Sequence, residues 1–216
     1  MLLLVGLGNP GPGHAGNRHN VGFMALEAIA RRHRFAAARA RFHALTAEGE
    51  VGGEKIIALE PTTYMNDSGR AVEAAAHFYK LAPERVIVIH DEIDLDPGRM
   101  KVKRGGGAGG HNGLRSIDAH LGNDYWRVRL GVGHPGHKDL VKHFVLHDFH
   151  KDERALIDKQ LDAVAEAFPL LAAGDPNGFM SKVDILMKPP RPPRQRQQDG
   201  ETPPPPPTGR PAGRAE

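Results

Sequence analysis

Two almost uninterrupted apolar runs constrain the fold of this chain more than any other sequence feature. Residues Leu2–Val5 and Arg85–Ile89 lack the alternation of a half-exposed strand, so we predict that both are strands covered on two faces. Apolar residues with helical spacing follow the first run at Val21–Arg34. Strands that are separated by a helix pair in parallel, because the helix carries the chain back across the sheet. An α/β fold is therefore expected.

Further patterns extend this sheet. The glycine pair at 52 and 53 indicates a hairpin that joins the strands Ala40–Glu48 and Lys55–Leu59. The other expected elements are the strands Arg99–Lys103 and Trp126–Val132 and the helices Ser68–Lys80, Gly113–His120 and Asp152–Ala172. Because hairpins add antiparallel pairs, the predicted fold is a single-domain α/β sandwich, a mixed twisted β-sheet flanked by helices.

The composition changes near residue 188. Residues 188–216 are rich in proline, arginine, glutamine and glycine, so we predict a disordered tail, with a weak RNA-binding or partner-binding arm as the alternative. Six of the 29 basic and three of the 26 acidic residues lie in this tail, which leaves residues 1–187 electrically neutral. One domain is expected at 1–187, and only local clusters of charge can argue for a nucleic-acid partner.

The chain lacks several features that would place it outside the cytoplasm. It has no cysteine, which excludes disulfides, thiolate metal sites and a cysteine nucleophile. No apolar run reaches the roughly 18 residues of a membrane helix, and the N-terminus does not have the pattern of a signal peptide. We expect a cytoplasmic protein with no membrane partner.

The glycines at 6, 8 and 11 fit the G-x-G-x-x-G spacing of a dinucleotide-binding loop. Such a site requires a helix at the third glycine, whose free N–H groups meet the pyrophosphate. Pro12 and Gly13 follow instead, and the basic stretch about 20 residues further on offers no carboxylate for a ribose. We therefore expect these glycines to form tight turns only.

Polar side chains gather where the predicted buried strands end. His19 follows the first strand and Asp91 the second, and the carboxyl edge of such a sheet is where α/β proteins bind ligands. An aspartate keeps one ring nitrogen of a histidine protonated and leaves the other free as a base. We predict that His19 pairs with Asp91. A capping or core role for His19 and a turn role for Asp91 are the alternatives.

Two asparagines and a glycine-rich segment also lie near this predicted edge. The amides of Asn66 and Asn112 are able to hold a developing oxyanion, although helix capping is the alternative for each. Six of the ten residues in Arg104–Gly113 are glycine, so this backbone can approach a ligand closely; a mobile loop without a ligand is the alternative.

Basic residues cluster on the predicted strands Arg99–Lys103 and Trp126–Val132, and one more follows the first of these strands. They are Arg99, Lys101, Lys103, Arg104, Arg127 and Arg129. Such a cluster suits phosphate groups, and a solvated strand face is the alternative.

Thirteen histidines raise the question of a metal site. They form no H-E-x-x-H motif and no cysteine supports them, so neither a metal nor another cofactor is predicted. There is also no G-x-S-x-G motif for a serine nucleophile. A His–Asp base that activates water is the expected catalytic device.

Five sequence blocks resemble those of bacterial-type peptidyl-tRNA hydrolases, in order and in spacing. They are GLGNPGPGHAGNRHNVG, PTTYMNDSG, HDEIDLDPG, GGGAGGHNGL and RVRLGVGHP, and the resemblance spans about Leu2–Met187. It implies a monomeric, metal-free α/β enzyme with its catalytic domain at 1–187. This enzyme would hydrolyse the ester between a peptide, or an N-blocked amino acid, and the 3′ ribose of tRNA, and so recycle tRNA from prematurely released peptidyl-tRNA.

The resemblance also implies roles for individual residues. His19 would be the general base, oriented by Asp91, and Asn9 would help to distinguish N-blocked from free aminoacyl esters. Asn66 and Asn112 would bind the tRNA terminus and the peptide backbone or steady the oxyanion. Tyr64 would lie beside the terminal adenosine of the CCA end, and Lys103 and Arg129 would contact the 5′ phosphate of the acceptor stem; Met65, His111 and His14 complete the expected binding set.

Two positions depart from the family pattern. His14 stands where relatives usually carry tyrosine, and Ala108 stands where they often carry histidine. Two rival functions remain open: a metal-dependent peptidase or amidase that uses the many histidines, and an RNA-binding relative that has lost hydrolysis. The presence of His19, Asp91 and both site asparagines argues against the second.

Overall fold

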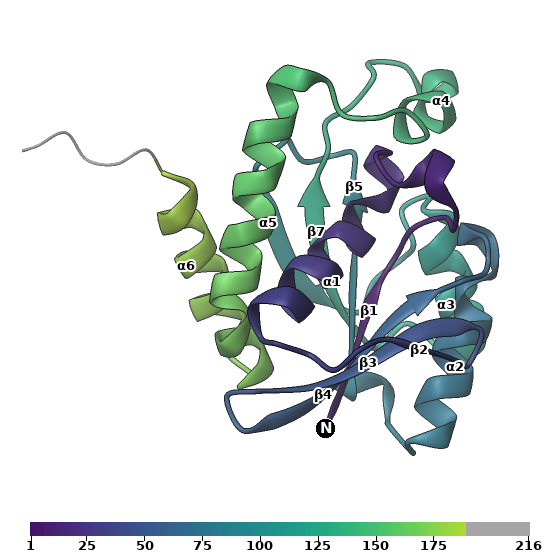
Figure 1. The fold of residues 1–216 in the computed structure, drawn as a ribbon. Helices are drawn as coiled ribbons and strands as arrows, with labels where there is room; N and C mark the ends of the chain where they lie inside the picture. Colours follow the sequence, from purple (N-terminus) through teal and green to yellow (C-terminus); the bar gives the residue numbers. More distant parts are fainter. Residues whose placement is uncertain (189–216) are drawn as a thin grey trace, which may run out of the picture.

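Two apolar strands form the centre of the sheet in the computed structural model, which describes residues 1–188 (Figure 1). β1 (Leu2–Gly6) pairs in parallel with β5 (Val86–Glu92) and with β4 (Glu54–Pro61). The order of the seven strands is β2–β3–β4–β1–β5–β7–β6. The remaining strands are β2 (Arg39–Arg41), β3 (Ala44–Val51), β6 (Met100–Arg104) and β7 (Trp126–Gly131). Because β2–β3, β3–β4 and β6–β7 are antiparallel, the sheet is mixed, as predicted.

Helices cover both faces of the sheet (Figure 1). One face carries α1 (Val21–Arg32), α5 (Lys151–Ala172) and α6 (Pro176–Met187), and the other carries α2 (Ser68–Phe78) and α3 (Asn112–Leu121). A short helix, α4 (Val141–Val145), lies near the N-terminal 3-10 turns (Figure 1). The 3-10 turns are η1 (Pro12–His14), η2 (Arg18–Asn20), η3 (Met65–Asp67), η4 (Pro83–Arg85) and η5 (Lys138–Leu140). The predicted α/β sandwich is therefore confirmed.

The apolar run of β1 explains why it lies at the centre. All five of its residues are buried, and alternate side chains enter two different cores. Leu2 and Leu4 pack with α1 and α5, whereas Leu3 and Val5 pack with α2. Each such side chain contributes roughly 1.5–3 kcal/mol when it is fully buried. Both faces of β1 meet apolar side chains, and the polar groups of this segment begin after the strand ends.

Three differences from the predicted elements have local causes. The expected strand Ala40–Glu48 is broken into β2 and β3 by a turn at Phe42 and His43, whose φ angles are +56° and +54°. β5 continues to Glu92 because it pairs with β7 over its whole end, so Asp91 lies within the strand and not after it. Two helices, α4 and α6, were not predicted.

The start of α6 carried a recognisable signal. Asp175 caps the helix by accepting a hydrogen bond from Gly178 N at 2.8 Å, and Pro176 occupies its first turn. The predicted disordered tail lies outside the described residues, apart from Lys188. None of the helices in residues 1–188 combines the length and the apolar character that a membrane span requires.

Candidate active site

Close packing of α1 against the sheet brings η2 to the end of β5. A Cβ on Gly22 would lie 2.4 Å from Ile89 O, and a Cβ on Gly6 would lie 2.5 Å from Gly22 O. Gly6 therefore serves close helix–strand contact, and Gly11, with φ +102°, is the one of the three motif glycines in a left-handed conformation. The expectation of tight turns was thus wrong for Gly6. α1 begins at Val21, well past the glycines, which excludes the dinucleotide geometry.

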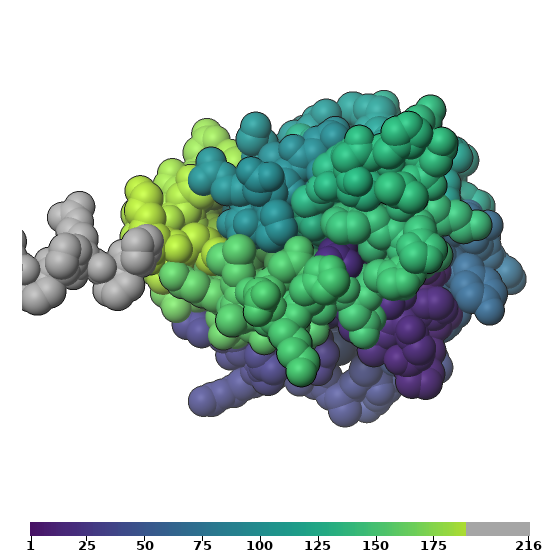
Figure 2. Space-filling view, turned by 90° about the horizontal axis from the view of Figure 1, so that it is seen from above, coloured from purple at the N-terminus to yellow at the C-terminus, as the bar shows by residue number. Residues whose placement is uncertain are grey.

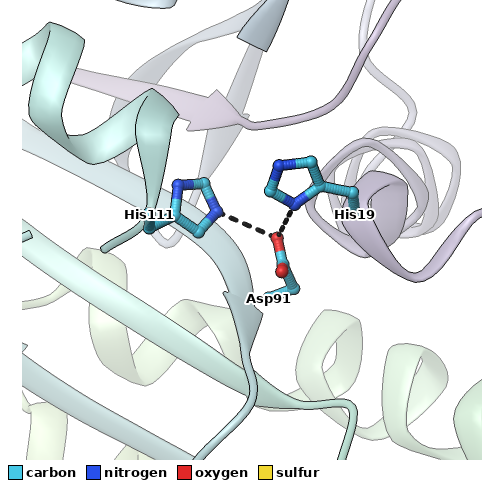
Figure 3. Close-up of side chains that lie close together, drawn as sticks. All are labelled: His19, Asp91 and His111. Carbon is cyan, nitrogen blue, oxygen red and sulfur yellow. Dashed lines mark hydrogen bonds and ion pairs between the residues drawn. The ribbon is translucent and has the colours of Figure 1, made fainter. Parts of the chain in front are cut away.

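His19, Asp91 and His111 form a three-residue cluster at this edge (Figure 3). His19 Nδ1 lies 2.8 Å from Asp91 Oδ1, so the predicted pair is in hydrogen-bond contact. His111 Nε2 lies 2.9 Å from the same oxygen. His19 Nε2 points away from Asp91 and has no hydrogen-bond partner among residues 1–188 (Figure 3). One aspartate oxygen thus accepts two ring N–H groups, and one histidine nitrogen stays available for a ligand.

Helix α3 fixes the tautomer of His111. Its Nδ1 accepts hydrogen bonds from Gly113 N at 3.1 Å and from Leu114 N at 3.3 Å, so this nitrogen carries no proton. The proton of the neutral ring therefore resides on Nε2, where it is donated to Asp91. Both nitrogens of His111 are occupied by the protein itself. Neither ring nitrogen is free for a hydrogen bond to substrate, and the predicted contact of His111 with substrate stays a prediction.

Burial and charge act in opposite directions on the acid–base pair. Asp91 is 4% exposed. Burial opposes its charge, but the two histidines outweigh burial and hold the pKa of Asp91 well below its usual range. Burial also opposes charge on His19, and the charge and hydrogen bond of Asp91 overcome it, so the pKa of His19 lies above its ordinary value. Asp91 is therefore a fixed anion that makes His19 a stronger base.

A third histidine, beside the two of this cluster, stays neutral. His90 is buried, its Nδ1 donates to Asp91 O at 2.7 Å, and its ring lies 5.0 Å from that of His111. Burial lowers the pKa of His90 to about 3. No positive charge from His90 therefore competes for the carboxylate of Asp91.

A second network fixes Asn9 through Asn20, a residue for which no role was predicted. Asn9 N donates to Asn20 Oδ1, and Asn20 Nδ2 donates to Asn9 O, both at 2.9 Å. Asn9 Oδ1 accepts from Met65 N at 2.9 Å. These bonds assign the orientation of the Asn9 amide and leave its Nδ2 as a donor without a partner in the described residues. The signal for Asn20 was its position next to His19.

The remaining predicted site residues differ in exposure. Tyr64 is 68% exposed, and Asn66 and Asn112 are also exposed. Neither asparagine side chain caps a helix; Asn66 has no hydrogen bond within residues 1–188, and Asn112 accepts one from Arg115. Met65 is buried beneath Gly113, so its side chain has a packing role and its contact with substrate stays a prediction. His14 Nδ1 lies 3.0 Å from Asn17 Oδ1.

The basic cluster separates into free and paired residues. Lys103 is exposed and forms no ion pair within residues 1–188. Arg129 Nε donates to Glu92 at 2.8 Å. Arg127 is 1% exposed, pairs with Asp118 at 2.9 Å and also donates to Gly107 O. Arg127 therefore holds the glycine-rich segment through Gly107 O. The prediction that Arg127 contacts phosphate does not fit its burial.

The His19–Asp91–His111 cluster is also the one group of described residues with metal-like spacing, since its ligand atoms lie within 4.8 Å of one another. A metal on His111 Nε2 would move the proton of the neutral ring to Nδ1. That proton would point at Gly113 N–H and Leu114 N–H, which Nδ1 now accepts. The two histidines and the aspartate are therefore better suited to forming two N–H···O hydrogen bonds than to binding a cation.

Comparisons with known proteins agree on one family. The family model described as peptidyl-tRNA hydrolase matches residues 3–191. The peptidyl-tRNA hydrolase of Acidiphilium cryptum is 63% identical over 87% of this chain and 98% of its own length, and that of Rhodospirillum rubrum is 58% identical over 88% and 78%. The crystal structure of peptidyl-tRNA hydrolase from Acinetobacter baumannii has a TM-score of 0.81 at 40% identity and covers 85% of this chain and 94% of that one. The chain belongs to the peptidyl-tRNA hydrolase family.

Proposed function

We propose that this protein hydrolyses the ester between the peptide and the 3′ ribose of peptidyl-tRNA, with His19 as the general base. Membership of the family makes it an ester hydrolase of this substrate class. The observation that carries the mechanism is the 2.8 Å contact of His19 Nδ1 with Asp91. When the neutral ring donates from Nδ1, its Nε2 carries no proton, and Nε2 has no partner in the described residues.

The proposed reaction uses water as the nucleophile. His19 Nε2 removes a proton from water while the water oxygen bonds to the ester carbonyl carbon. The tetrahedral intermediate collapses as the bond to the ribose oxygen breaks, and the proton held by His19 passes to that oxygen. Asp91 stabilises the imidazolium that forms in between. The exposed amides of Asn66 and Asn112 are the donors that we assign to the oxyanion or the adjoining backbone.

The fixed orientation of Asn9 supports a preference for N-blocked substrates. Because Oδ1 is occupied by Met65 N, Asn9 offers only its Nδ2 donor. In an N-blocked substrate the amino nitrogen is acylated, and the carbonyl oxygen of that peptide bond can accept a hydrogen bond from Asn9 Nδ2. A free aminoacyl ester carries an ammonium group there instead, which needs acceptors.

Exposed side chains around the centre suit the nucleic-acid part of the substrate. Tyr64 offers a face on which the terminal base of the CCA end can stack. Lys103 and Arg129 offer positive charge for phosphates of the acceptor stem. We further propose that residues 1–187 form the catalytic unit and that the protein acts as a cytoplasmic monomer.

The decisive experiment compares N-acetylated with unblocked aminoacyl-tRNA as substrates. Wild type is expected to cleave the blocked substrate selectively, and His19→Ala is expected to lose about 10²–10⁴-fold in rate. His77→Ala, which replaces an exposed histidine on α2, serves as the control and is expected to cleave at the wild-type rate. Full activity of His19→Ala would contradict the base assignment. Binding of tRNA by wild type without cleavage would favour the binding-only function, and loss of activity with a chelator would favour a metal enzyme.

A further inference from the structure

We propose that Arg18 is a positioning residue for His19. It clamps the turn that carries the base to the segment that joins α4 to α5, here called the connector (residues 146–150), and to the first turn of α5. The proposal rests on the proposed function, since it concerns the same base. Arg18 directly precedes His19 in η2 and is 2% exposed, although arginine is rarely buried to this extent.

The bonds of Arg18 all lead to one distant part of the chain. Its Nη1 donates to Asp148 O at 2.7 Å and to His147 O at 3.3 Å, and its Nη2 donates to Glu153 Oε2 at 2.7 Å. Its backbone N–H also donates to His147 O, at 3.0 Å. The neighbouring Asn17 adds a bond from Nδ2 to Asp148 Oδ1 at 2.8 Å. The turn and the connector are thus joined by side-chain and backbone bonds at the same point.

Aromatic rings and a helix cap hold the guanidinium in place. It lies 4.3 Å from the ring centroid of Phe144 and 5.3 Å from that of Phe149. The same Glu153 oxygen accepts a hydrogen bond from His150 N and so caps α5. Arg18 is therefore attached to the fixed end of a long helix. Seen from above, the green connector and the start of α5 adjoin the purple N-terminal loop (Figure 2).

The three residues of η2 contact three different segments. Arg18 bonds to the connector and α5, His19 to Asp91 in β5, and Asn20 to Asn9 in the first loop. A short 3-10 turn has few hydrogen bonds of its own, so these three contacts determine its orientation. Loss of the Arg18 contact frees one side of the turn and lets the His19 ring move relative to its carboxylate.

Burial of this cation is costly, which argues that packing alone does not explain it. Arg18 Nε is buried and has no acceptor among residues 1–188. A buried charge with an unpaired donor stabilises a fold less than an apolar side chain of similar volume would. By contrast, Arg32 and Glu166 join α1 to α5 through an exposed pair at 3.0 Å, far along the helix from η2. Both ion pairs join neighbouring elements, but only the pair formed by Arg18 lies on the turn that carries His19.

The test compares Arg18→Gln, Arg18→Lys and Glu153→Gln with the matched control Arg32→Gln, using N-acetylated aminoacyl-tRNA. Arg18→Gln is expected to lower kcat by roughly 10- to 100-fold, because a small displacement of a catalytic group has effects of this size. KM is expected to stay within about twofold, since no substrate contact is removed. Arg18→Lys should restore part of kcat, because lysine keeps the charge but not the planar fork. Arg32→Gln should keep the wild-type kcat.

A spectroscopic readout separates positioning from general loss of structure. The ring N–H proton that His19 shares with Asp91 is followed by proton NMR and is identified by its absence in His19→Ala. It should shift or broaden in Arg18→Gln and stay unchanged in Arg32→Gln. The proposal is overturned if kcat of Arg18→Gln equals that of Arg32→Gln, if only KM changes, or if the His19 proton keeps its position.

Two further arrangements keep the test decisive. If Arg18→Gln does not fold, Arg18→Lys and Glu153→Gln take its place, and wild-type kcat together with an unchanged His19 proton in both would overturn the clamp. If His19→Ala hydrolyses at the wild-type rate, the base assignment fails, and the NMR signal alone then decides whether Arg18 positions the ring.

Discussion

The centre and the rim of the site differ in what their polar groups bind. In the centre, Asp91 is 4% exposed and accepts N–H groups from His19 and His111. At the rim, Tyr64 is 68% exposed, and the exposed Lys103 forms no ion pair within residues 1–188. Folding itself therefore orients the groups assigned to chemistry, whereas the groups assigned to recognition keep their capacity for a ligand.

This difference predicts two kinds of kinetic effect. Substitutions in the centre disturb geometry that exists before the substrate binds, so they should lower kcat. Substitutions at the rim remove contacts that form only with the substrate, so they should raise KM. A central variant that changes only KM, or a rim variant that changes only kcat, would break the comparison.

Asp91→Asn is expected to have the largest effect after loss of His19 itself. The acid limb of the pH–rate profile should lie above the ordinary histidine pKa, because Asp91 raises the pKa of His19 and only neutral His19 acts as a base. Removal of the charge lowers that pKa, so the limb should move to lower pH while the maximal rate falls by at least about 100-fold. Asp96→Asn, which changes an exposed aspartate after β5, is the control. An acid limb at the same pH in Asp91→Asn would assign it to another group.

His111 tests whether the second donor to Asp91 matters apart from the helix cap. His111→Asn keeps a good N-cap residue but is too short to reach Asp91, whereas His111→Ala removes both contacts. A hydrogen bond to a charged group contributes about 1.5–3 kcal/mol, so both variants should lose roughly tenfold or more in kcat. His111→Ala should lose about 1 kcal/mol more unfolding free energy than His111→Asn, because it also removes the helix cap; denaturant titration measures the difference. Wild-type kcat in His111→Asn would limit His111 to capping.

Local patterns in the sequence were enough to predict the main layers and the central pair. β1 and β5 are so apolar that their place in the sheet followed, and parallel pairing brings their carboxyl ends together. This is why His19 and Asp91 were paired correctly although 72 positions separate them. The family resemblance added roles that spacing alone left open.

Contacts that depend on three-dimensional packing could not be predicted in the same way. Arg127 looked like its neighbour Arg129, but α3 and the glycine-rich segment cover it, and Asp118 pairs with it. The bonds of Arg18 reach residues 129 to 135 positions away, on the connector and on the first turn of α5. Charged residues are usually exposed, so the sequence favoured the wrong environment for Arg127, and no pattern indicated that Arg18 is buried.

Lys103 and Arg129 sharpen the comparison at the rim, with smaller effects. Lys103 has no ion pair within residues 1–188, whereas Arg129 is already partly neutralised by Glu92. Lys103→Gln should therefore raise KM several-fold and lower the slope of log affinity against log salt by about one, as expected for one lost phosphate contact. Arg129→Gln should have the smaller effect on both quantities. Equal slopes for wild type and Lys103→Gln would remove Lys103 from the phosphate contacts.

Removal of residues 189–216 should have the smallest effect. A truncation after Lys188 keeps the backbone oxygen to which Lys159 Nζ donates, so α5 loses no described contact. The tail carries only a small excess of basic over acidic residues, and so small an excess of positive charge adds only weak, salt-dependent attraction to tRNA. We expect kcat to be unchanged and KM to stay within about twofold at physiological salt, because screening weakens such charges beyond about 8 Å. A rise in KM that grows as salt is lowered, with kcat constant, would instead make the tail an RNA-binding extension of the rim; a fall in kcat would contradict the assignment of catalysis to residues 1–187.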